Sequence, residues 1–136
     1  MALDVWVGDW NEHGSKLIVS FDPEAYYSFL YPLFEEFEQT YGQMIDLYDG
    51  AMFQADALVS VFELIDKAKT FVSSQDEQFD VHMGINLGSY VEPKTEEIFC
   101  TVQRNEFLQF IERWRTATQM AQEAGKPLIF YGDWPT

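Results

Sequence analysis

The stretch FDVHMGINL, residues 79–87, alternates large apolar residues with polar or small ones along its whole length. This period of two is typical of a β-strand that has one buried face. A second strand-like run, EIFCTV, occupies residues 97–102, and EPKTE at 92–96 supplies turn residues between them. The pattern predicts an antiparallel hairpin whose first strand buries one row of apolar side chains, namely Phe79, Val81, Met83, Ile85 and Leu87.

A first helix is predicted after Asp22-Pro23. An aspartate oxygen can cap the first turn, and a proline at the first helical position loses no hydrogen bond. Pro32 falls inside the apolar pattern and cannot donate to the carbonyl four residues back. We therefore expect a kink or two short helices, ended by Gly42.

Two further segments show apolar residues at helical spacing. One covers residues 58–72, and its outer face carries Glu63 and Lys67 in the favourable order for an i,i+4 ion pair. The other runs from about 105 to 124 and is followed by Gly125, a typical helix stop. Both segments are long enough to cover a sheet.

Four more strands are expected from short apolar runs. They occupy residues 3–7, 17–21, 43–48 and 128–131. The predicted order is ββ-α-β-α-ββ-α-β, which indicates an α+β fold with a mixed, mainly antiparallel sheet and about three helices packed on it. A chain of 136 residues suits a single domain spanning residues 1–136.

The net charge of −15 is unevenly distributed along the chain. Residues 1–66 hold thirteen acids and one base, whereas residues 67–136 hold ten acids and seven bases. Such a field repels nucleic acid and anionic lipid and attracts basic protein surfaces. The alternative is that the acidity only keeps the protein in solution.

Acids and aromatic rings are concentrated together between residues 31 and 50, where no basic side chain occurs. Phe34, Phe37 and Tyr41 follow the apolar stripe and are expected in the core, whereas Tyr27 and Tyr31 fall off it. Acids can attract a basic partner, and exposed rings can hold it. We expect the partner-binding residues to be Glu35, Glu36, Glu38, Asp46, Tyr48, Asp49, Asp133 and Trp134.

Catalytic and metal-binding patterns are weak. A small hydrolase or transferase could use Asp80, His82 and Cys100 on the predicted hairpin, but Cys100 lies among apolar residues as a core cysteine would. The acids Asp46, Asp49 and Asp56 do not fit a calcium loop, although a looser magnesium site from scattered carboxylates stays open. We predict a protein without catalytic residues, metal or cofactor.

Cysteine usage and hydropathy bear on the compartment. The single cysteine excludes an internal disulfide, which favours a reducing environment. The N-terminus MALDVWVGDW lacks the features of a signal peptide, and no apolar run is long enough to span a membrane. The sequence therefore predicts a cytoplasmic protein.

Two segments resemble a known family. They are IDLYDGAMF at 45–53 and AQEAGKPLIFYGD at 121–133. Together with the size and acidity, they are similar to the small cytoplasmic immunity proteins encoded beside bacterial polymorphic or contact-dependent toxins. The resemblance covers residues 43–133 and implies a non-enzymatic protein that binds one cognate toxin and blocks its active site or an essential surface nearby.

The charge suggests what kind of toxin this would be. An acidic inhibitor suits a basic, nuclease-type toxin domain, whose nucleic-acid groove is positively charged. An interaction module of a larger complex is the remaining alternative, and it would show a large apolar patch instead of an acidic one.

Overall fold

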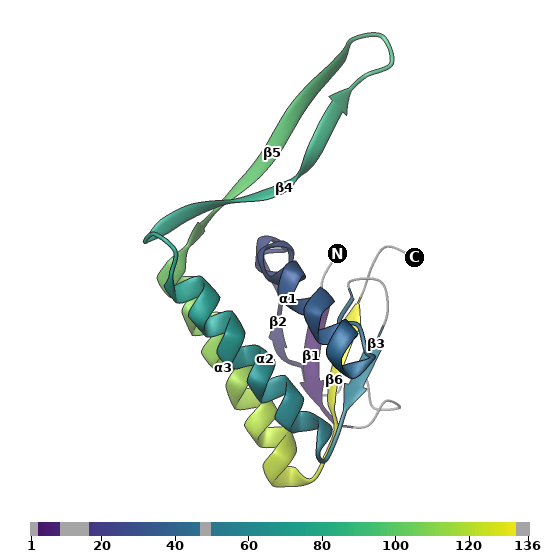
Figure 1. Cartoon of the computed structure of the whole chain (residues 1–136), viewed down its shortest axis with the longest axis vertical. Coiled ribbons are helices and arrows are strands. Elements are labelled where there is room, and N and C mark those ends of the chain that lie inside the picture. Colours follow the sequence, from purple (N-terminus) through teal and green to yellow (C-terminus); the bar gives the residue numbers. More distant parts are fainter. Residues whose placement is uncertain (1–2, 9–16, 47–49, 133–136) are drawn as a thin grey trace.

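The computed structural model describes residues 3–8, 17–46 and 50–132. The element order is that expected from the sequence, and the fold is α+β (Figure 1). In chain order the elements are β1 (Leu3–Val7), β2 (Leu17–Ser20), α1 (Ala25–Tyr41), β3 (Gly50–Phe53), α2 (Ala57–Ser73), β4 (Gln78–Gly88), β5 (Pro93–Gln103), α3 (Arg104–Ala124) and β6 (Leu128–Gly132).

The strands divide into two antiparallel sheets. Among the described residues, four strands form the main sheet in the order β2-β1-β6-β3, while β4 and β5 pair only with each other. Within the described residues every pairing is antiparallel. In the main sheet Phe130 of β6 lies opposite Val5 of β1 and Ala51 of β3. These cross-strand neighbours share one face, which is the face turned to the helices.

An aromatic cluster joins α3 to this face of the sheet. Trp114 of α3 is fully buried, and its ring centroid lies 5.3 Å from that of Phe21 and 6.0 Å from that of Phe130. Phe110, one turn earlier on α3, lies 4.6 Å from Phe21. Edge-on ring contacts of this kind add to the stabilisation from burial, so the cluster fixes the helix against the strands.

The ends of α1 show one correct and one wrong prediction. Gly42 ends the helix in the left-handed conformation, with φ of 80°, and its N–H donates to the Glu38 carbonyl at 2.8 Å. At the start, Asp22 does not cap the helix. Instead the Asp22-Pro23 peptide is cis, and Glu24 takes the cap position without a side-chain bond.

Pro32 does not divide α1, which runs as one helix from Ala25 to Tyr41. Of the two predicted outcomes, a kink or two short helices, the second is therefore wrong. Pro32 lies on the exposed side, while Leu30 and Phe34 on either side of it are buried. Packing of the apolar stripe outweighs the one lost backbone hydrogen bond.

The strand predicted at 43–48 is displaced along the chain. Residues 43–46 are not a strand, 47–49 lie outside the described residues, and the strand instead spans Gly50–Phe53. One contact and one burial pattern explain this. The Tyr27 hydroxyl donates to the Ile45 carbonyl at 2.9 Å, which holds that loop, and Ala51 and Phe53 provide the alternating buried residues.

The hairpin of β4 and β5 projects from the rest of the molecule (Figure 1). Its base is packed, because Val81 and Val102 are buried and the Phe79 ring lies 4.9 Å from that of Phe29 on α1. Farther along β4, Ile85 and Leu87 are 52% and 69% exposed. The predicted continuous buried face is thus wrong beyond the base.

The turn of the hairpin also differs from the prediction. It lies at 89–92, where the Glu92 N–H donates to the Ser89 hydroxyl oxygen at 2.9 Å, and β5 already begins at Pro93. Most of the segment expected to turn the chain is therefore strand.

Candidate functional site

The predicted acidic cluster lies on the exposed face of α1. Glu35, Glu36 and Glu38 are exposed, whereas Phe34 and Phe37 between and beside them are buried. This arrangement follows from helical periodicity, because the apolar residues three apart take the inner face and leave the acids outside. The helix thus presents three carboxylates to the surroundings.

Basic residues neutralise this charge only in part. Lys67 of α2 lies with its Nζ 2.6 Å from the Glu36 Oε1, and this hydrogen bond raises the pKa of Lys67 above its usual value. Arg115 of α3 pairs with Asp66. Glu35 and Glu38 form no ion pair with any residue in the described part of the chain. Exposed pairs of this kind contribute little to stability.

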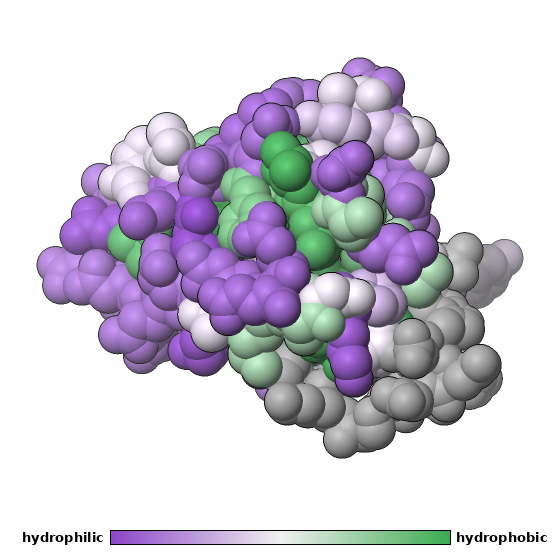
Figure 2. Space-filling view, turned by 90° about the horizontal axis from the view of Figure 1, so that it is seen from below, coloured by the Kyte–Doolittle hydropathy of each residue, from purple (hydrophilic) through white to green (hydrophobic). Residues whose placement is uncertain are grey.

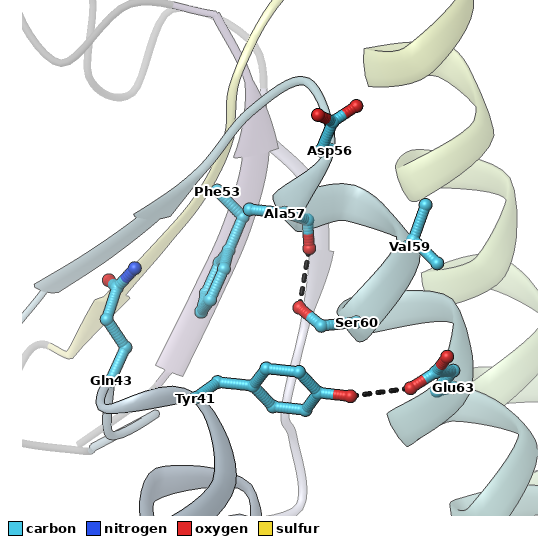
Figure 3. Close-up of a pocket in the computed structure, with 8 residues that line it drawn as sticks. All are labelled: Tyr41, Gln43, Phe53, Asp56, Ala57, Val59, Ser60 and Glu63. Atoms are coloured by element: carbon cyan, nitrogen blue, oxygen red, sulfur yellow. Dashed lines mark hydrogen bonds between the residues drawn. The ribbon is translucent and has the colours of Figure 1, made fainter.

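A pocket lies beside the end of α1, between that helix, β3 and the start of α2 (Figure 3). Its volume is about 380 Å³. Phe53, Ala57 and Val59 supply its apolar part, while carboxylates and an amide lie around them. The residues that line it are Tyr41, Gln43, Phe53, Asp56, Ala57, Val59, Ser60 and Glu63.

Tyr41 forms the polar contact between the two helices at this pocket. Its hydroxyl donates to the Glu63 Oε2 at 2.6 Å (Figure 3). The hydrogen bond to the carboxylate raises the pKa of Tyr41 above its usual value. The prediction that Tyr41 belongs to the core is wrong, because the side chain is 47% exposed. It is the last residue of α1, where the helix ends at the surface of the body.

The expected ion pair within α2 is also wrong. Glu63 accepts from Tyr41, and Lys67 reaches Glu36 instead. Both partners come from α1, which lies alongside α2. A charge pattern on one helix could not show that a second helix offers closer partners.

The pocket combines apolar walls with negative charge. Asp56 and Glu63 place two carboxylates around Phe53 and Val59. Such surroundings suit a side chain that has an apolar stem and a positive end, as lysine and arginine have. Ser60 donates its hydroxyl proton to the Ala57 carbonyl at 2.6 Å, and none of the described residues that line the pocket is a histidine that could serve it as a base.

Hydrophilic residues surround the apolar ones at the lower end of the body, where α2 begins and α3 ends (Figure 1). Figure 2 shows the body from below, with a small apolar area bordered by hydrophilic side chains.

The other predicted contact residues have different outcomes. Asp46 is half-buried, and Tyr31 is exposed. Tyr27 is buried and bonded to the Ile45 carbonyl, so its expected role as an outer contact is wrong. Tyr48, Asp49, Asp133 and Trp134 lie outside the described residues.

Asp80, His82 and Cys100 do not converge. Cys100 lies opposite Val81, on the face of the hairpin that packs against the core. Asp80 and His82 flank Val81 along β4 and so point to the other face. The Asp80 carboxylate accepts from the Thr101 hydroxyl at 2.7 Å. The three side chains of the enzymatic alternative therefore lie on two faces of one ribbon.

Sequence reasoning missed most of the pocket. The sequence patterns suggest Asp56 only as a metal ligand, and they do not connect Gln43, Val59 and Glu63 with partner binding. A weak signal exists in Val59 and Glu63, an exposed apolar and an acidic residue at i,i+4 on one face of α2. Among the described residues, no three side chains of His, Cys, Asp or Glu are grouped so as to hold a metal ion.

Comparisons with known proteins give no relative. No protein-family model, no curated protein and no solved structure matches this chain. None of the helices within the described ranges is long and apolar enough to cross a bilayer.

Proposed function

We propose that this chain is a cytoplasmic immunity protein that binds and neutralises a basic, nuclease-type toxin domain. The observation that carries the proposal is the outer face of α1 beside the acidic pocket, where Glu35 and Glu38 form no ion pair with any residue that the structure describes. The toxin's positive groove would dock on this face, so that the inhibitor covers the surface that binds nucleic acid.

The acids on α1 lead toward the pocket. Glu35, Glu38 and Tyr41 are spaced by three residues, so they lie on successive turns of the helix. A negative field of this kind accelerates encounter with a basic partner to about 10⁸ M⁻¹s⁻¹ or more at low salt. The pocket then offers the place where a lysine or arginine of the partner is held.

A second candidate, an interaction module of a larger assembly, has support from a different region. The β4–β5 hairpin exposes several large apolar side chains away from the acidic face. An inhibitor can also use such a surface. The toxin inhibitor and the interaction module therefore differ in the partner that they bind, because both act by binding another protein.

The class of partner is tested by co-expression. The probe is the C-terminal domain of the protein encoded by the adjacent upstream gene, produced in cells with and without this chain. We expect this chain to restore growth and to abolish nuclease activity of the purified domain at equimolar ratio. Unchanged toxicity with a soluble, folded chain would reject the proposal.

The role of α1 is tested by association kinetics. Reversing two charges with Glu35→Lys and Glu38→Lys should slow association by about tenfold or more at low salt, and the difference should shrink as salt is added. Glu123→Lys, an exposed acid on α3, is the matched control and should have a smaller effect. An equal effect of all three would mean that net charge alone matters and not the α1 face.

A further inference from the structure

We propose that the projecting part of the β4–β5 hairpin is a second docking surface, which binds an extended basic segment of a protein partner along the open edge of β4. The proposal rests on the proposed function only for the identity of that partner. It adds an apolar contact to the electrostatic one on α1.

The exposed side chains of the hairpin are the first observation. Ile85, Leu87 and Phe99 are each more than half exposed, and Tyr90 and Val91 at the tip are almost fully exposed. Contiguous apolar surface of this kind commonly marks an interaction site. A two-stranded ribbon alone is marginally stable in water, so a third strand or a covering surface would stabilise it.

A β-bulge determines which face these side chains take. Val81 pairs with Cys100 and His82 with Phe99, but the next pair is Gly84 with Ile98. Met83 is therefore an extra residue in β4. A shift by one residue exchanges the two faces of a strand. Ile85 and Leu87 thus leave the core-facing side on which Phe79 and Val81 lie.

The result is an apolar row on the outer face, formed by Ile85, Leu87 and Phe99. Two contacts support this placement. The rings of His82 and Phe99 lie 5.2 Å apart, and the His82 Nε2 lies 3.9 Å from the Glu97 Oε1, so these residues share the outer face. Ile85 pairs with Glu97 and consequently lies on that face as well.

The charges of the hairpin favour a basic partner over a second copy of this chain. On β4, β5 and their turn, the exposed acids outnumber the single lysine, Lys94. These acids are Asp80, Glu92, Glu96 and Glu97. Two copies, each with a net charge of −15, would bring like charges together. A segment that alternates apolar residues with lysine or arginine would match both the apolar row and the acids around it.

The two edges of the hairpin differ in how well they can accept a strand. Both strands pair only with each other, so each has an outer edge. On β5 this edge carries Pro93 and Lys94 near the tip, residue types that discourage strand addition. Between His82 and Gly88, β4 contains neither proline nor lysine. Strand addition is a common mode of peptide recognition, and the β4 edge fits it better.

The experiment uses the full chain and a defined probe. Its backbone amide resonances are followed while a synthetic peptide of alternating lysine and valine is added, and a peptide of alternating glutamate and valine serves as control. We expect saturable shifts in residues 82–99 with the basic peptide only. Leu87→Ser and Phe99→Ser should each weaken binding by about tenfold or more, because each removes a large apolar contact. Met52→Ser, an exposed apolar residue of β3 that does not line the pocket, should leave the affinity unchanged.

Three outcomes would overturn the inference. They are shifts that lie outside the hairpin, equal binding of both peptides, and a dimer in sedimentation that Leu87→Ser dissociates, which would make the second copy the occupant. The proposed function can fail separately. If the upstream toxin domain is not neutralised while the basic peptide still binds along β4, the toxin assignment is wrong and the docking surface stands.

Discussion

The same alternation of apolar and polar residues has opposite outcomes in the body of the molecule and in the projecting hairpin. In β1 and β6, alternating apolar residues such as Val5 and Phe130 are completely buried. In β4 the alternation continues just as regularly, yet Ile85 and Leu87 are exposed. An alternating pattern thus predicts that a strand has an apolar face, but not that the fold covers it.

Whether the apolar face of a strand is buried depends on a second layer of structure packed against it. The main sheet is backed by α3, which contacts β1, β2 and β6 along its inner face. The hairpin reaches beyond the helices, so only its base has such support, from Phe29 and Phe107 around Phe79 (Figure 1). The body is therefore stabilised by its own packing, which the outer part of the hairpin lacks.

The largest difference between the two regions should appear on truncating a phenylalanine. Phe110→Ala in the aromatic cluster should lower the free energy of unfolding by about 3–5 kcal/mol, because it leaves a cavity among buried rings. Phe99→Ala on the hairpin should cost less than about 1 kcal/mol, because the ring is already half in water. Urea denaturation followed by circular dichroism measures both. Similar losses for the two variants would mean that the hairpin is packed in solution.

Much of the body could be predicted from sequence because its signals are local. The positions of α2 and α3 follow from helical spacing of residues such as Leu58 and Trp114, and Gly125 marks the end of α3. The displacement of β3 could not be predicted in this way. It depends on Tyr27 of α1, distant in sequence, whose hydroxyl donates to the Ile45 carbonyl in the segment predicted to be a strand.

The candidate site was less predictable than the fold. The exposed acids of α1 followed from periodicity, but the pocket joins the end of α1 to β3 and α2. Tyr41 illustrates the difficulty, since its spacing fits the apolar stripe and only the packing of α2 shows that it faces Glu63 at the surface. The bulge at Met83 was also missed, although Gly84 beside it is a residue type that often marks a bulge.

A smaller and more local effect is expected at the tip of the hairpin. Gly88 has φ of 77°, and a Cβ there would lie 2.6 Å from the Glu92 carbonyl oxygen. Gly88→Ala should therefore destabilise the tip by about 1–3 kcal/mol, through strain and a backbone clash. Since the tip is separate from the core, hydrogen exchange should accelerate in residues near 86–94 and not in α3. Gly42→Ala, a left-handed glycine of the body with free space around its Cβ position, is the matched control. Uniformly faster exchange in the Gly88 variant would show that hairpin and body unfold together.

The smallest effect concerns a polar contact on the surface of the body. The Tyr41 hydroxyl donates to Glu63 at 2.6 Å, whereas the polar contact on the outer hairpin, between His82 and Glu97, spans 3.9 Å. The Glu63 hydrogen bond raises the pKa of Tyr41, so the stability that it contributes is complete below pH 10 and is lost as pH rises through the higher pKa of the folded state. Glu63→Gln should shift the phenolate absorbance titration of Tyr41, isolated as the difference from Tyr41→Phe, to lower pH. Glu97→Gln should leave that titration unchanged, because the hairpin carries no partner of Tyr41. An unshifted midpoint in Glu63→Gln would show that the hydrogen bond drawn in Figure 3 does not join α1 and α2 in solution.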